Sequence, residues 1–427
     1  MTPPVTAPGP APVAWPRGFR FASGHCGVKR KASDLMLVTM DPPAAAAAVF
    51  TTNRLQAAPV RLSRAHLQAS GGRVRAFLVN SGNANCATGA AGRRAALAMA
   101  RTTARLLHCP VEQVLVGSTG VIGQPLPVEK ILAALPRWLD LVSPLGAGDE
   151  REPASGRPGA QPPSKGGASR TPLAAAHAIR TTDTCAKIAG ASFRDGGRTY
   201  RIAGMAKGSG MIHPRMATMF GFLFTDAPLT PAACNRALRR AVDASFHRIS
   251  VDGDTSTNDT ATLFASGSGR PLSPQGAQAF QAALIKVAQA LARQIVLDGE
   301  GARHFVTLEV EGARSFADAD TVARALAHSP LVKTALAGAD ANWGRVLSTA
   351  GWCGVPFLPE RASIWFSRVP VYLRGAVVPF DEAEVKHRLE RREVVVRLHL
   401  GAGRARAWMW TCDLTEGYIR INGAYRT

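Results

Sequence analysis

The sequence has few acidic residues and few aromatic ones. It holds 30 Asp and Glu residues against 51 Lys and Arg, a formal net charge of +21, and only 6% of its residues are aromatic. A basic surface attracts nucleic-acid phosphates. Here, however, the basic residues are spread along the chain, without a basic run interleaved with aromatics and without a known nucleic-acid motif. We therefore expect no nucleic-acid partner and attribute the charge to solubility.

Paired cysteines and long hydrophobic runs are also missing. The seven cysteines are scattered and form no Cys-x-x-Cys pair, so neither a zinc centre nor a redox centre is indicated. No apolar run approaches the roughly 18 residues that span a bilayer, and the proline- and alanine-rich start does not resemble a signal peptide. We expect a cytoplasmic protein with free thiols, no metal and no membrane association.

Hydrophobic residues, at 46% of 427, suffice for more than one packed unit. Apolar residues from Phe280 to Ile295 recur at helical spacing after Ser273-Pro274, a typical helix start. Further helices are expected at about 90–108, 128–138, 230–246 and 317–328, and strands at Ala76–Asn80, Gln113–Val116, His304–Val310, Val371–Val378, Val394–Leu400 and Ala407–Cys412. This mixture predicts an α/β (α+β) protein in which helices flank layered mixed sheets.

One stretch has the composition of a disordered insertion. Residues 144–171 are rich in Pro, Gly, Ser and Ala with mixed charges, and such a segment cannot bury enough apolar surface to order itself. We expect it to lie on the surface.

The most informative segment runs from Lys207 to Met219 and places Thr218 after a turn that contains Gly208 and Gly210. Thr218 is either a buried structural residue or a nucleophile. A threonine hydroxyl becomes a useful nucleophile when a base is held beside it. If the Ala217–Thr218 bond were cut, the new α-amine of Thr218, with an ordinary pKa of about 7.7–8.0, would supply that base.

This segment closely resembles the self-cleaving threonine signature of the ornithine acetyltransferase / glutamate N-acetyltransferase family of arginine biosynthesis. Other blocks of the family pattern follow in order along the chain: Phe50–Arg54, Val79–Asn85, Gly117–Gly123, Thr181–Thr184, Val251–Asp259, Asp298–Ala302, Gly338–Arg345 and Tyr418–Asn422. The resemblance implies the family's fold and its self-cleavage into residues 1–217 and 218–427.

The resemblance also implies a role for individual residues. Thr218 is the nucleophile, and the cleavage site lies between it and Ala217. Thr119 and Gly120 stabilise the oxyanion, and their sequence setting favours a turn after the strand that ends at Val116. The substrate-binding residues are Thr181, Lys207, Thr218, Glu300, Asn422 and Thr427. Because Thr182 adjoins Thr181, the register there stays open, and any single Lys is otherwise read as a solvated surface residue.

Acetyl transfer from N-acetylornithine to glutamate through an acetyl-threonine intermediate is the implied reaction, in an α2β2 assembly of the two chains. No cofactor is implied, although acetyl-CoA as a second donor stays open. One alternative is an N-terminal-threonine amidase in which water replaces glutamate as the acceptor. Another is a binding protein without activity, which would stay uncut.

Two details qualify the resemblance. Residues 252–259 superficially suggest a calcium loop, but Thr257 stands where that loop needs glycine and Leu263 where it needs glutamate. We instead expect a hydrogen-bonding loop near the site. Arg215 stands where the family pattern commonly has asparagine, which bears on the cleavage rate and not on the chemistry.

Overall fold

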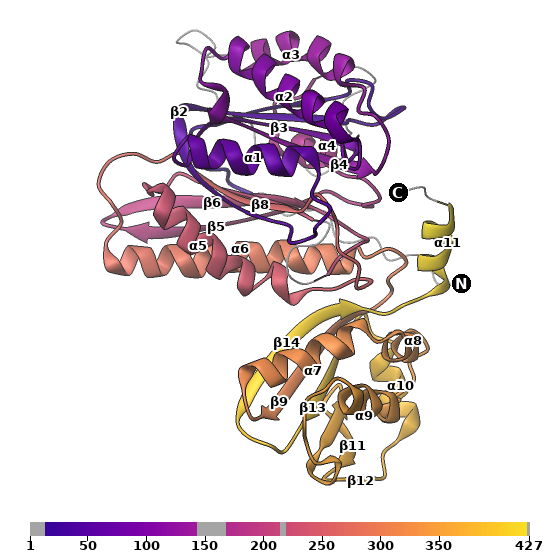
Figure 1. Ribbon diagram of the computed structural model, residues 1–427. Coiled ribbons are helices and arrows are strands. Elements are labelled where there is room, and N and C mark those ends of the chain that lie inside the picture. The colour runs from indigo at the N-terminus through magenta and orange to yellow at the C-terminus, as the bar shows by residue number, and fades with distance from the viewer. Residues whose placement is uncertain (1–12, 143–167, 214–218, 425–427) are drawn as a thin grey trace.

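The computed structural model describes residues 13–142, 168–213 and 219–424. These residues form a layered sandwich, in which helices cover the outer faces of two sheet layers, and a smaller unit with its own sheet (Figure 1). The predicted mixed α/β architecture is confirmed.

The two inner layers of the sandwich belong to one sheet. Its strand order is β4 (Val114–Val121), β3 (Arg73–Asn83), β2 (Leu35–Phe50), β8 (Thr260–Ala265), β7 (Phe220–Thr225), β6 (Arg198–Lys207) and β5 (Lys187–Asp195), and β1 (Phe19–Gly24) pairs with β2. The register of β2 against β3 shifts between Thr39 and Ala44, and Ala45–Phe50 then pair with β8. The long strand β2 thus links the two layers. Buried phenylalanines fill the space between them, with the rings of Phe77 and Phe222 4.8 Å apart.

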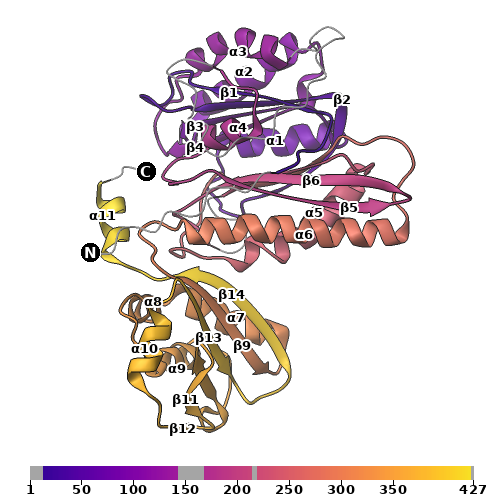
Figure 2. The same ribbon diagram turned by 180° about the vertical axis from the view of Figure 1, so that it is seen from behind.

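Helices cover both outer faces of the sandwich (Figures 1 and 2). α2 (Gly89–Leu106) and α3 (Val128–Val142) pack on the β1–β4 side, and α5 (Pro231–Asp243) and α6 (Pro274–Leu297) on the β5–β8 side. α1 (Ala58–Ala69) contacts β4, and α4 (Pro172–Ala178) contacts β1. α6 is long and apolar enough to cross a membrane by length and composition. Its apolar stripe, with Phe280 and Leu291, is nevertheless buried against β5 and β6 in the manner of a core helix.

The smaller unit has the strand order β12 (Ala376–Val377), β11 (Val369–Leu373), β10 (Ser363–Phe366), β13 (Glu393–His399), β9 (Phe305–Ala313) and β14 (Ala405–Cys412). Its helices are α7 (Phe316–His328), α8 (Pro330–Ala337), α9 (Trp343–Trp352) and α10 (Glu382–Leu389). The single strand expected at 371–378 is wrong, because Arg374 and Gly375 take positive φ angles and turn the chain between β11 and β12. After β14, the chain returns to the sandwich as α11 (Glu416–Ala424) (Figure 1).

The predicted cleavage boundary does not coincide with these folding units. β6, before residue 217, pairs with β7, after it, so that Lys207 lies opposite Phe220. β2 and β8 join the same two parts of the chain a second time. The segments 1–217 and 218–427 are therefore interleaved in one sheet.

The expected insertion at 144–171 falls mostly outside the described residues, which omit 143–167. The expectation of disorder is wrong for its last four residues. Ser169 exchanges two backbone hydrogen bonds of 2.8 and 2.9 Å with Ser23, and the Thr171 hydroxyl accepts one from the Ala174 amide at the start of α4. These bonds hold the end of the segment against β1.

Candidate active site

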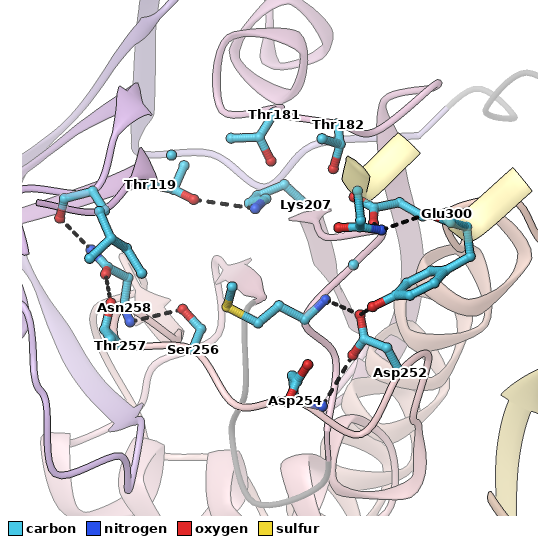
Figure 3. Close-up of a pocket in the computed structure, with 17 residues that line it drawn as sticks. Thr119, Thr181, Thr182, Lys207, Asp252, Asp254, Ser256, Thr257, Asn258 and Glu300 are labelled. Atoms are coloured by element: carbon cyan, nitrogen blue, oxygen red, sulfur yellow. Dashed lines mark hydrogen bonds between the residues drawn. The ribbon is translucent and has the colours of Figure 1, made fainter. Parts of the chain in front are cut away.

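A pocket of about 190 Å³ lies where β4 and β6 meet the loop after α6, the loop before β8 and helix α11 (Figure 3). Among the residues that line it are six that the sequence analysis singled out: Thr119, Gly120, Thr181, Lys207, Glu300 and Asn422. Ala217, Thr218 and Thr427 lie outside the described residues. Met211 lines the pocket. The described part of the chain continues to His213 and begins again at Met219, directly before β7.

Thr119 and Gly120 approach the pocket from β4. The expected turn at these residues is wrong, because β4 continues to Val121 and pairs with β3 through Ser81 and Gly82. The pairing register shifts at Gly82 and Asn83, where the strand pair becomes irregular beside the pocket. Gly120 has a φ of +130°, and a Cβ on it would lie 2.3 Å from the Gly82 carbonyl carbon. Only glycine fits this approach of two backbones.

Lys207 is the last residue of β6 and is 2% exposed, so the reading as a solvated surface lysine is excluded. Its ammonium donates to the Thr119 hydroxyl at 3.2 Å (Figure 3). Burial lowers the pKa of Lys207, while the nearby carboxylates of Asp183, Asp259 and Glu300 oppose the shift. A buried cation thus faces the hydroxyl expected to stabilise an oxyanion.

A buried ion triad lies behind the pocket wall. Lys187 Nζ is 2.7 Å from Asp183 Oδ1 and 2.5 Å from Asp298 Oδ2. Asp183 also accepts the backbone N–H groups of Thr181, at 3.0 Å, and Gly208, at 2.6 Å. One carboxylate therefore fixes the loop of Thr181 and the residue that follows Lys207. Burial opposes ionisation of Asp183, but the charges of Lys187 and Lys207 hold its pKa well below the ordinary range.

Thr181 and Thr182 both line the pocket, so the structure leaves the register between them open. In Figure 3 both hydroxyls point toward the cavity, and that of Thr182 lies 2.8 Å from the Ser209 hydroxyl.

The opposite side of the pocket is acidic. Glu300 follows the C-terminal end of α6 and is held by its own N–H, which donates to the Ser209 carbonyl at 2.8 Å. Its carboxylate accepts from the Asn422 amide of α11 at 2.8 Å. Gly210 lies so close that a Cβ on it would be 2.3 Å from Glu300 Oε2. An alanine at 210 would therefore displace the Glu300 carboxylate, and Gly208, with a φ of +147°, takes a backbone conformation that favours glycine.

The loop from Asp252 to Asp259 forms the floor of the pocket. Asp252 accepts the N–H groups of Met211 and Ile212 and the Tyr418 hydroxyl. Burial raises the pKa of Asp252, although the backbone donors oppose the shift. Farther along, Asn258 donates to the carbonyls of Ala84 and Ser118, each at 2.7 Å. The expectation of a hydrogen-bonding loop near the site is confirmed.

Comparisons with known proteins identify the family. The ArgJ family model matches residues 20–427. The chain belongs to the ArgJ family. It is 47% identical to the arginine biosynthesis bifunctional protein ArgJ of Chlorobaculum tepidum, over all of both chains. It is 43% identical to the ArgJ protein of Symbiobacterium thermophilum, over 97% of this chain and 98% of that one.

Solved ArgJ-related structures align with part of the chain. A crystal structure of ArgJ from Bacillus halodurans shares 37% identity and aligns with a TM-score of 0.46, covering 48% of this chain and 98% of that one. The ornithine acetyltransferase of Mycobacterium tuberculosis, solved with ornithine, shares 33% identity and aligns with a TM-score of 0.36, over 48% of this chain and 94% of that one.

Membership of the ArgJ family confirms the activity expected from the sequence, an acyltransferase of arginine biosynthesis that acts on small molecules. The sequence analysis did not single out the pocket residues Met211 and Tyr418, nor the ion triad behind them. A methionine has no reactive group that marks it as a site residue, and the nearby residues Gly210 and His213 do not indicate that Met211 lines a pocket. Tyr418 stood in a matched block, and only the helix α11 brings it to Asp252.

Proposed function

We propose that this ArgJ-family chain transfers the acetyl group of N-acetylornithine to glutamate at the pocket around Lys207, with Thr218 as the nucleophile after cleavage of the Ala217–Thr218 bond. The observation that carries the proposal is the meeting of Thr119, Gly120, Thr181, Lys207, Glu300 and Asn422 around one cavity. They come from elements up to 303 positions apart in the sequence, yet they meet around a cavity that Met211, seven residues before Thr218, also lines.

The charges of the pocket suit an amino-acid substrate. Lys207 and Glu300 both line the cavity, which places a cation on one side and a carboxylate on the other (Figure 3). N-acetylornithine carries a carboxylate and a side-chain ammonium. Pairing with Lys207 and Glu300 would orient the acetyl group between them, because each charged end has a matching partner.

The reaction then follows in two halves. The Thr218 hydroxyl attacks the acetyl carbonyl, and its α-amine takes the hydroxyl proton and passes it to the leaving ornithine amine. Thr119 and the Gly120 N–H stabilise the oxyanion, an effect that is typically about 10²–10³ in rate for each donor. The α-amine of glutamate then attacks the acetyl-threonine ester. Both halves use one pocket, so ping-pong kinetics are expected.

Mutation of Thr218 tests both cleavage and transfer. Wild-type protein should give two bands on a denaturing gel, one of them beginning Thr-Met-Phe, and should form acetylglutamate from N-acetylornithine and glutamate. Thr218→Ala should stay an intact 45.0 kDa chain without transferase activity. A wild-type protein that is uncut and fully active would refute the mechanism.

The same assay separates the amidase alternative. When glutamate is left out, a transferase holds the acetyl group on Thr218 after one turnover, whereas an amidase continues to release acetate. Labelled acetyl-CoA tests the second donor, which we include because the relatives are named bifunctional. Labelled acetylglutamate formed without N-acetylornithine would establish that activity.

We also propose an α2β2 assembly in the cytoplasm. The pairing of β6 with β7 and of β2 with β8 supports two chains that stay together after cleavage. All seven cysteines lie within the described residues, and none forms a disulfide there, which suits a reducing compartment. Native mass measurement and cell fractionation test the two points.

A further inference from the structure

Cleavage needs a base that the mature site does not explain. Before the Ala217–Thr218 bond is cut, the Thr218 nitrogen is part of a peptide bond and cannot take up the hydroxyl proton. The α-amine invoked for acetyl transfer is a product of cleavage. Another group must therefore accept the proton while the hydroxyl attacks.

Asp259 lies beside the peptide that follows Thr218. Its Oδ1 accepts the Met219 N–H at 2.6 Å. The Met219 nitrogen is four covalent bonds from the Thr218 hydroxyl oxygen, a span of at most about 5 Å in any conformation. The carboxylate is consequently close to Thr218 by covalent geometry alone.

The second oxygen of Asp259 is available. Asp259 is 1% exposed, and its Oδ2 is buried without a hydrogen-bond partner among the described residues. Buried polar atoms are normally paired, so an unpaired carboxylate oxygen requires an explanation. Lys207 is the charged side chain that acts on Asp259 among these residues, and the hydrogen bond of its ammonium goes to Thr119 instead.

We propose that Asp259 is the proton acceptor for self-cleavage, an inference that rests on the proposed role of Thr218. The Thr218 hydroxyl gives its proton to Asp259 Oδ2 while its oxygen bonds to the Ala217 carbonyl carbon. When the carbon–nitrogen bond breaks, Asp259 returns the proton to the Thr218 nitrogen, which becomes the free amine. Water then hydrolyses the ester and leaves the Ala217 carboxylate and the Thr218 hydroxyl.

The environment of Asp259 suits this exchange. Burial raises the pKa of its carboxyl well above the ordinary value, although the Met219 N–H and Lys207 oppose the shift. A carboxylate with a raised pKa is a stronger base than an ordinary carboxylate. Its protonated form is a weaker acid by the same amount, so it returns the proton less readily. The base form exists above this pKa, so the cleavage rate should rise with pH until Asp259 is ionised.

The test measures cleavage of newly made full-length chains. Wild type, Asp259→Asn and Asp259→Glu are pulse-labelled during cell-free synthesis and chased at pH values from about 6 to 9, and the loss of the 45.0 kDa precursor is followed on denaturing gels. Asn keeps an oxygen for the Met219 N–H but accepts no proton. We expect Asp259→Asn to be cleaved at least about 100-fold more slowly and without the pH-dependent rise, in line with general-base catalysis, and Asp259→Glu to regain part of the rate.

Asp226→Asn is the matched control. Asp226 also accepts a strand N–H, that of Arg201, at 2.7 Å. Arg201, however, is six residues from Lys207 along β6, which is about 20 Å at the usual strand rise. The Asp226→Asn variant should be cleaved at the wild-type rate. Cleavage of Asp259→Asn within about threefold of wild type would overturn the inference.

Failure of this inference is distinct from failure of the proposed function. An uncut but active wild type refutes the role of Thr218, whereas rapid cleavage of Asp259→Asn refutes only the role of Asp259. If the Asn variant does not fold, as judged by solubility and thermal unfolding against Asp226→Asn, the cleavage rate of Asp259→Glu decides. The extra methylene moves the proton acceptor, so a wild-type rate in Asp259→Glu would overturn the inference.

Discussion

Removing the ammonium of Lys187 should destabilise the protein more than removing any comparable buried amine. Lys187 is fully buried and pairs with Asp183 and Asp298. Lys187→Met leaves these two carboxylates buried together without their cation. Breaking a buried ion pair in this way typically lowers the free energy of unfolding by about 3–5 kcal/mol, and we expect a loss at the upper end because two carboxylates lose one shared partner.

Lys333→Met is the matched control. Lys333 is 3% exposed, and its ammonium binds the Thr411 hydroxyl and the Cys412 carbonyl. Its removal leaves neutral acceptors, for which the penalty is about 1–3 kcal/mol. Urea unfolding in a Thr218→Ala background, in which each variant should remain one chain, compares the two. Adding Asp183→Asn and Asp298→Asn to Lys187→Met should recover at least half of the loss.

The pH dependence gives a second measurement. Burial lowers the pKa of Lys187, but Asp183 and Asp298 together outweigh it and raise the pKa in the folded protein. The contribution of Lys187 is therefore complete below 10.5 and is lost as the pH rises through the folded value. The pKa of Asp183 is lowered, so its contribution is present above 3.8 and is lost as the pH falls. The deficit of Lys187→Met should be largest near pH 7 and shrink below about pH 4. A loss no greater than that of Lys333→Met would refute the triad as a source of stability.

Two substitutions test the acidic side of the pocket. Glu300→Gln should raise KM for N-acetylornithine about 10- to 100-fold in steady-state assays, with a smaller effect on kcat. This change in KM is equivalent to about 1.5–3 kcal/mol for a hydrogen bond to a charged group. An unchanged KM would exclude pairing of Glu300 with the ornithine ammonium. Gly210→Ala should raise the same KM at least about tenfold, because its Cβ would lie 2.3 Å from Glu300 Oε2. The control is Gly351→Ala in α9, whose Cβ would meet nothing within 4 Å, and its kinetics should match wild type.

The sequence predicted elements well where their pattern was local. The helix at Phe280–Ile295 and the strands at Val394–Leu400 and Ala407–Cys412 occur within a few residues of the expected bounds. β2 was missed. Its run of alanines from Ala44 to Ala48 favours a helix by intrinsic propensity, but Ala44–Ala47 are buried between neighbouring layers, where small side chains allow close packing. Long-range packing therefore overrides the local preference.

Pocket residues with distinctive chemistry could be found from motif order, but the bonds that hold them could not. Asp252 and Asp259 are seven residues apart, and each binds backbone about 40 positions earlier, at Ile212 and Met219. Backbone bonds from Val251 to the Ile212 carbonyl and from Thr260 to the Met219 carbonyl reinforce both attachments. One loop thus binds the chain on each side of the predicted cleavage segment. Because neither set of hydrogen bonds involves the bond to be cut, cleavage can separate Ala217 from Thr218 while the flanking backbone keeps its hydrogen bonds.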